Sequence, residues 1–150
     1  MRKAVLISIK PEWCELIASS RKTVEVRKSR PKLETPFKCY IYCTKSPKGW
    51  FFMNSPDVRR DGKVIGEFVC NEIERVGIPY PAYQSELDKR YIEQSCVSYY
   101  ALHRYFGRDD GYFWHISDLK IYDKPKELSE FKVTRPPQSW CYVEEGEDNV

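Results

Sequence analysis

The order of strand-like and helix-like segments is the feature that most constrains the fold of this chain. Strand-like segments outnumber helix-like ones, and the two kinds do not alternate regularly. Strands are expected over residues 4–9, 23–29, 37–44, 62–76, 111–123 and 139–144. A doubly wound parallel sheet needs regular strand–helix alternation, which this order lacks. The sequence therefore predicts a mixed α+β domain built around a small, largely antiparallel sheet or barrel.

Three short helices are expected between these strands. The first covers residues 11–20, with Pro11 at a helix-starting position. A turn or two is expected over residues 85–94. The third runs over residues 98–107, with Ser98 as N-cap, Gly107 as the stop, and an apolar stripe on one side. The members of that stripe are Leu102, Tyr105 and Phe106. The stretch between residues 45 and 61 is predicted to be irregular, and Gly66 is expected to mark a bulge.

Length and composition indicate one compact domain. The chain has 150 residues, 41% of them hydrophobic and 31% charged, with a net charge of +3. The domain is expected over residues 1–143, and the acidic residues 144–150 are expected to form a disordered tail. The first apolar run is short and ends at Lys10 and Pro11, unlike a secretory or membrane-spanning segment. A cytoplasmic protein that does not enter membranes is expected.

The six cysteines and two histidines lack the spacing of a metal site. No CxxC or HxxxH pair occurs among them. Cys14, Cys70 and Cys96 lie in apolar surroundings, where a free thiol behaves as a small hydrophobic residue. Reduced cysteines, no metal and no cofactor are therefore expected.

Positive charge gathers in one part of the chain. Residues 21–34 contain six basic and two acidic residues, a local charge of +4 that exceeds the total of +3. Within this stretch, Val24 and Val26 alternate with Glu25 and Arg27, as in a half-buried strand. A lone carboxylate in a basic strand either belongs to a solvated surface face or adds selectivity to an anion-binding site.

The segment "SRKTVEVR", residues 20–27, resembles the GxKxxExR signature of the ASCH domain, a member of the PUA-like superfamily. The segments "YIYCTK", "GKVIGEF", "HISDLKIYDKPKEL" and "RPPQSWCYVEE" also resemble small stand-alone ASCH proteins of bacteria and phages, so the resemblance covers most of the chain. It implies a pseudo-barrel of mixed strands, a cleft beside the helix before the signature, and RNA binding by analogy with PUA domains. One departure is Ser20, which stands where the signature has glycine.

The candidate binding residues follow from the signature and its surroundings. Lys22 and Arg27 would supply positive charge for a phosphate or a base edge, while Glu25 would accept hydrogen bonds from an amine or a ribose hydroxyl. Lys10 and Trp13 are expected to flank the same cleft, and Tyr42 lies on a neighbouring strand. Trp13 and Tyr42 fit a core position as well as a stacking position.

Two main functions remain open from the sequence. The first is a domain that binds RNA or a modified nucleotide in a basic cleft. The alternative is a hydrolase of a modified nucleoside or an RNA phosphodiester, in which Lys22 and Glu25 would be the catalytic residues. A protein-interaction domain is a third possibility, and the sequence leaves the oligomeric state open.

One specific activity is not carried over by the resemblance. A related branch of the superfamily hydrolyses N4-acetylcytidine with a threonine nucleophile at the position that Glu25 occupies here. Thr23 lies two strand residues away, a displacement of about 6 to 7 Å that is too large for a nucleophile.

Overall fold

The computed structural model of the chain describes residues 2–77 and 86–146. The helices are α1 (Pro11–Ala18), α2 (Glu86–Ser95) and α3 (Tyr99–Phe106), with a 3₁₀ turn η1 (Leu128–Phe131). The strands are β1 (Lys3–Ile9), β2 (Val24–Arg27), β3 (Phe37–Cys43), β4 (Phe51–Phe52), β5 (Ser55–Arg59), β6 (Lys63–Val76), β7 (Gly111–Lys126) and β8 (Trp140–Glu144). None of the described helices has the length and apolar character needed to cross a membrane.

Six strands form one sheet in the order β2-β7-β6-β3-β1-β8. Only β1 and β3 pair in parallel, and the other four pairings are antiparallel. The predicted mixed α+β class with a largely antiparallel sheet is thus confirmed. The structure differs in residues 45–61, where β4 and β5 form a separate two-stranded hairpin in place of the expected irregular stretch.

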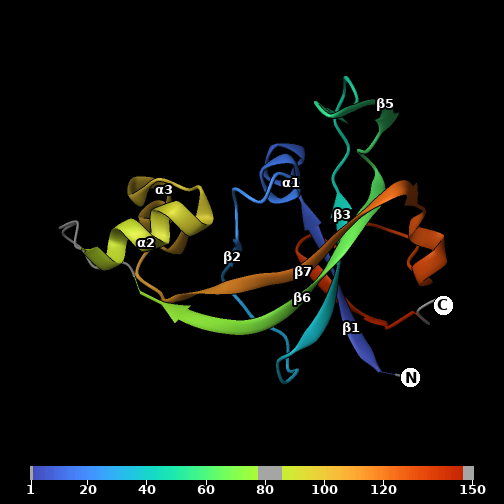
Figure 1. The fold of residues 1–150 in the computed structure, drawn as a ribbon. Helices are drawn as coiled ribbons and strands as arrows, with labels where there is room; N and C mark the ends of the chain where they lie inside the picture. Colours follow the sequence, from blue (N-terminus) through green and yellow to red (C-terminus); the bar gives the residue numbers. More distant parts are fainter. Residues whose placement is uncertain (1, 78–85, 147–150) are drawn as a thin grey trace.

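The two longest strands determine the shape of the molecule. Figure 1 shows β6 and β7 running side by side, with α2 and α3 at one end and η1 near the other. The helix α1 lies between α2 and α3 on one side and the β4–β5 hairpin on the other (Figure 1). The largest core cluster packs α1 against β1, β3, β6 and β7, with Trp114 fully buried in it.

Gly66 lies where β6 bends, as the sequence predicts. The register of β6 against β7 shifts between Val64 and Gly66, and that of β3 against β6 shifts between Ile41 and Tyr42. A Cβ atom on Gly66 would lie 2.5 Å from the carbonyl oxygen of Lys120. Only glycine allows the two strand backbones to approach so closely.

Side chains connect the two edges of the sheet. The strands β2 and β8 lie at opposite ends of the strand order. The Arg27 guanidinium of β2 nevertheless donates to the hydroxyl of Ser139, just before β8, at 2.9 Å. The indole N–H of Trp140 donates to the hydroxyl of Ser29 at 3.1 Å. We call this connection the seam. The predicted barrel is therefore a sheet whose edges meet through side chains.

The ordered part of the domain extends further toward the C-terminus than the sequence predicts. Glu144 still belongs to β8, and the amide of Glu145 donates to the carbonyl of Arg2 at 2.7 Å. The amide of Gly146 donates to the Tyr40 hydroxyl at 2.9 Å. The tail expected from residue 144 therefore does not begin before residue 147, and residues 147–150 lie outside the described part of the chain.

Ser20 adopts the left-handed conformation that the glycine of the signature would favour. Its φ is 63°, directly after the C-terminal end of α1. The turn is fixed by neighbouring backbone bonds, because the amides of Arg21 and Lys22 both donate to the carbonyl of Leu16 at 3.0 Å. The turn is therefore formed without glycine and holds Ser20 in a strained backbone conformation.

Replacing Ser20 by glycine is expected to stabilise the protein by about 0.5–1 kcal/mol. The left-handed conformation costs a non-glycine residue roughly 1–2 kcal/mol, and the greater freedom of glycine in the unfolded chain offsets part of the gain. Urea denaturation of wild type and Ser20→Gly measures the difference. Ser19→Gly is the matched control, because Ser19 has a negative φ of -85° and is expected to gain nothing. Equal effects of the two substitutions would contradict the argument.

Candidate functional site

A cleft of about 590 Å³ opens on one side of the molecule. Its walls are the start of α1, the residues of β2 and the turn before it, the helix α3, and the segment before β8. We call that last segment, residues 136–139, the strap. The main polar and aromatic lining residues are Ser8, Lys10, Trp13, Lys22, Glu25, Arg27, Thr44, Tyr105 and Gln138.

Glu25 lies at the centre of a buried ion cluster on the cleft floor. Its carboxylate is 3.7 Å from the Lys22 ammonium and 3.0 Å from the Arg27 guanidinium. Lys22 and Glu25 are only 2% and 5% exposed. Two cations and one anion give the cluster a net charge of +1. Unpaired charges are costly to bury, so each member of the cluster depends on the other two.

The Lys22 ammonium is held on several sides. It donates to the carbonyl oxygen of Ser95 at 2.6 Å and lies 4.9 Å from the centre of the Trp13 ring. Burial lowers the pKa of Lys22, and the nearby Glu25 carboxylate counteracts only part of that effect. Lys22 therefore loses its proton more readily than an exposed lysine.

Arg27 connects three parts of the cleft wall. One terminal nitrogen contacts the carbonyl and hydroxyl oxygens of Ser139, at 3.3 and 2.9 Å. The other donates to the carbonyl of Ser8 at 2.6 Å and to Glu25 at 3.0 Å. Both terminal nitrogens are thus engaged by the protein, and a planar guanidinium cannot turn toward a ligand without breaking these bonds. Arg27 holds the seam closed beside the cleft.

Five of the six residues expected at the site line this cleft: Lys10, Trp13, Lys22, Glu25 and Arg27. The sixth, Tyr42, lies elsewhere, because successive residues of β3 point to opposite faces of the sheet. Ile41 and Cys43 face the core beneath α1, whereas Tyr42 is 2% exposed in a second core cluster with Leu6. The placement of Tyr42 beside the cleft is therefore corrected.

The helix α3 contributes a cleft residue that the sequence did not predict. Leu102 and Phe106 are buried as the apolar stripe predicts, but Tyr105 is 40% exposed and lines the cleft. The Lys28 ammonium lies 5.0 Å from the centre of the Tyr105 ring. Nothing in the local sequence of α3 indicates that this helix faces the signature strand. That contact depends on the positions of β6 and β7, which precede and follow the helical segment in the chain.

A second group of ionisable residues lies on β6 and β7, outside the cleft. His115 Nε2 is 3.0 Å from Glu74 and 3.4 Å from Glu72, an arrangement compatible with a metal ion. Arg90 already engages both oxygens of Glu74, at 2.6 and 3.3 Å. The ion pair between Arg90 and Glu74 ties α2 to the sheet.

The fold and the cleft together define a small α+β domain with a buried ion cluster at the floor of a polar and aromatic cleft. No protein-family model matches the chain, and no curated protein matches it in sequence. Among solved structures, the chain is similar to the ASCH protein from Zymomonas mobilis, with 24% identity over 95% of this chain and 88% of that one and a TM-score of 0.69.

Two variants of the same Zymomonas mobilis protein give equivalent results. A tyrosine-to-phenylalanine variant and a serine-to-alanine variant each have a TM-score of 0.70 and 24% identity. They cover 96% of this chain and 92% and 90% of theirs, respectively. The chain therefore has the fold of a small stand-alone ASCH protein, as the resemblance implied.

Proposed function

We propose that this protein binds RNA or a nucleotide-like ligand in the cleft above Lys22, Glu25 and Arg27. The observation that carries the proposal is the opening of a buried, positively charged cluster into a cleft with aromatic side chains on two sides. Fold similarity alone does not establish function, but a PUA-like domain is consistent with RNA binding.

The cleft offers complementary groups for a nucleotide. Tyr105 presents part of an aromatic ring on which a base can stack. Each carboxylate oxygen of Glu25 can accept more than one hydrogen bond, which leaves acceptor capacity for an exocyclic amine. The exposed Lys10 at the start of α1 supplies a charge for a phosphate.

Fluorescence anisotropy with labelled single-stranded RNA and DNA at two salt concentrations tests the proposal. Affinity is expected to fall as salt rises, because phosphate contacts release counterions. Tyr105→Ala should weaken binding about tenfold or more, the scale of one lost stacking contact. Tyr100→Ala is the matched control, since Tyr100 lies on the same helix, is 70% exposed and does not line the cleft. Absence of binding to every probe, or equal effects of the two substitutions, would contradict the proposal.

One observation favours hydrolysis as a second candidate function. The lowered pKa of Lys22 suits proton transfer, and Glu25 lies beside it as a possible general base toward water. Chromatography of RNA and acylated nucleosides after incubation with the protein tests this candidate. Substrates that remain intact would exclude it while leaving the binding proposal in place.

A further inference from the structure

Three basic residues that directly follow the signature do not line the cleft. Lys28, Arg30 and Lys32 follow β2 and are all exposed. No acidic residue occurs between Val26 and Leu33. Lys22 and Arg27 are engaged inside the cluster, and Arg21 is exposed before β2. Lys28, Arg30 and Lys32 therefore provide the exposed positive charge that follows β2.

The two ends of this basic segment contact two different sites. At one end, the Lys28 ammonium lies over the ring of Tyr105, which lines the cleft. At the other end, the backbone amide of Lys32 donates to the Tyr142 hydroxyl at 2.7 Å. The Lys3 ammonium lies 5.3 Å from the centre of the same Tyr142 ring. The segment therefore leads from the cleft to Tyr142 on β8.

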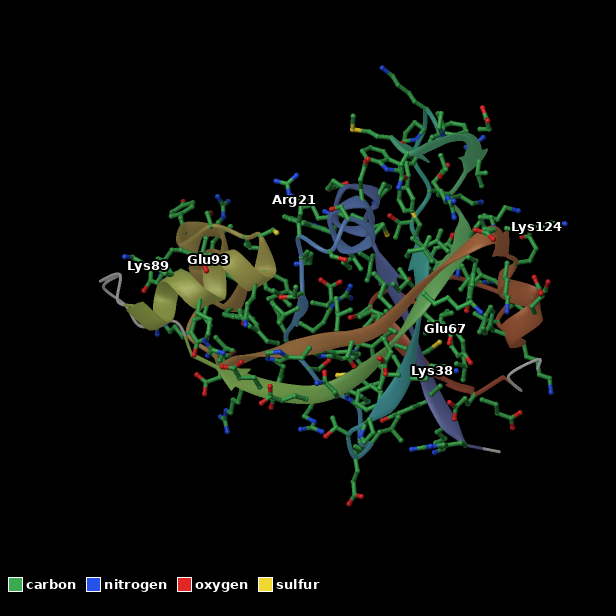
Figure 2. The ribbon with its side chains drawn as sticks, viewed as in Figure 1. Arg21, Lys38, Glu67, Lys89, Glu93 and Lys124 are labelled. Carbon is green, nitrogen blue, oxygen red and sulfur yellow. The ribbon has the colours of Figure 1, made fainter. Side chains whose placement is uncertain are left out.

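Tyr142 lines a second groove, of about 960 Å³, beside η1 and the end of β7. Five exposed lysines line this groove: Lys3, Lys120, Lys124, Lys126 and Lys132. Figure 2 shows Lys124 near the η1 end of β7. The groove and the cleft share no lining residue.

The groove also contains five carboxylates, but three of them are already engaged. Lys38 lies 3.0 Å from Glu67 and 3.7 Å from Glu145, and Figure 2 shows Lys38 close to Glu67. Glu130 accepts the amide of Glu127 at 2.8 Å within the cap of η1. These contacts reduce the repulsion that an approaching anion would meet, while the five lysines stay exposed.

We propose that Lys28, Arg30, Lys32 and Lys3 form a phosphate track that carries a single-stranded nucleic acid from the cleft to the second groove. The inference rests on the proposed function and specifies its ligand as a polymer. A mononucleotide occupies the cleft alone, whereas a basic segment that reaches up to about 17 Å along five residues contacts several phosphates. An electropositive path beside an aromatic stacking site is typical of proteins that bind single strands.

The test compares the variant Lys3→Gln/Arg30→Gln/Lys32→Gln with wild type. This triple variant leaves Lys28, which touches Tyr105, in place. The probes are a labelled mononucleotide and single-stranded oligonucleotides of three to twelve residues, at several salt concentrations. The control is Lys45→Gln/Lys48→Gln/Arg75→Gln, which removes the same charge from exposed residues outside both sites.

The track variant is expected to bind the longer oligonucleotides at least tenfold more weakly, with mononucleotide affinity unchanged. The slope of log affinity against log salt should become shallower by about 2, since each phosphate contact on a single strand contributes about 0.7. The control should keep the wild-type slope. Equal losses in the two triple variants, or no loss in either, would overturn the track while leaving the proposed function in place.

Three further results would also overturn the inference. If wild type binds neither mononucleotide nor oligonucleotide, the proposed function fails and the track with it. If poly-glutamate competes as well as an oligonucleotide of equal charge, the basic segment is a site for acidic protein segments. A wild-type affinity that does not increase with oligonucleotide length would show that the cleft alone binds the ligand.

Discussion

Replacing Glu25 by alanine is expected to lower the free energy of unfolding by about 3–5 kcal/mol, the usual cost of removing one partner from a buried ion pair. The variant leaves the Lys22 ammonium and the Arg27 guanidinium close together without the anion that separates them. The backbone amide of Val26 also loses its contact to the Glu25 carboxylate, at 3.2 Å. Urea denaturation at neutral pH measures the effect.

A surface acid provides the matched control for this prediction. Glu34 is exposed, so Glu34→Ala is expected to change stability by less than about 0.5 kcal/mol. Glu25→Gln keeps the shape of the side chain and removes only its charge, which separates electrostatics from packing. Similar stability of Glu25→Ala and Glu34→Ala would show that the cluster contributes little to folding.

The pH dependence of Glu25→Gln gives an independent check. The Glu25 carboxylate raises the pKa of Lys22 against the larger lowering effect of burial, so Lys22 in the variant should lose its proton at a lower pH than in wild type. Between the two folded-state pKa values, wild type holds one proton more than the variant. The difference in free energy of unfolding between wild type and Glu25→Gln therefore decreases as pH rises from the lower to the higher of these two pKa values. Both values lie below the ordinary lysine pKa of 10.5. An advantage that grows with pH there would contradict the assignment.

The sequence predicted those parts of the fold that depend on local patterns. Alternation identified β2, Pro11 marked the start of α1, and Ser98 caps α3 by accepting the amide of Ala101 at 3.1 Å. Gly66 marked the bend in β6 because no other residue fits so close to Lys120. For β2, α1 and α3, neighbouring residues determine the outcome. For Gly66, the glycine is visible in the sequence, but the need for it comes from the close approach of β7.

The site depends on contacts between distant segments, and local patterns did not predict these. Tyr105 lines the cleft because α3, which lies between β6 and β7 in the chain, packs beside the signature strand. The strap lines the cleft through Pro137 and Gln138. The position of Tyr42 depends on the register of β3, where a shift of one residue changes which face a side chain occupies. Lys22 and Arg27 also have partners that no local pattern predicts, because Ser95 and Ser139 lie far along the chain.

The second large effect is expected for Arg27→Ala, which should destabilise the protein by about 3–5 kcal/mol. The variant leaves Glu25 without its closest cation and removes the contacts to Ser8 and Ser139. Arg30→Ala is the matched control, because Arg30 is exposed and its hydrogen bonds reach only nearby carbonyls, those of Pro31 and Leu33. Comparable losses in the two variants would show that the seam does not depend on Arg27.

Hydrogen exchange shows which part of the structure is destabilised in Arg27→Ala. The amide of Ser8 donates to the carbonyl of Ser139 at 2.9 Å, and the Ser8 hydroxyl donates to the carbonyl of Pro137 at 2.7 Å. If Arg27 holds the strap against β1, the Ser8 amide should exchange faster in Arg27→Ala than overall unfolding explains. The amide of Ile116, which donates to Thr23 on the other side of β2, should show no additional increase.

Arg27→Lys separates charge from geometry at this position. Lysine keeps the positive charge beside Glu25, but its single nitrogen cannot reproduce the contacts that the two guanidinium nitrogens make to Ser139 and Ser8. The variant should therefore recover part of the lost stability and leave the Ser8 amide exchanging faster than in wild type. Nucleic-acid affinity measured under conditions where the variant is folded then gives the decisive comparison. If charge at position 27 contacts the ligand directly, Arg27→Lys binds like wild type, and if Arg27 acts by holding the cleft wall, affinity falls together with protection of the Ser8 amide.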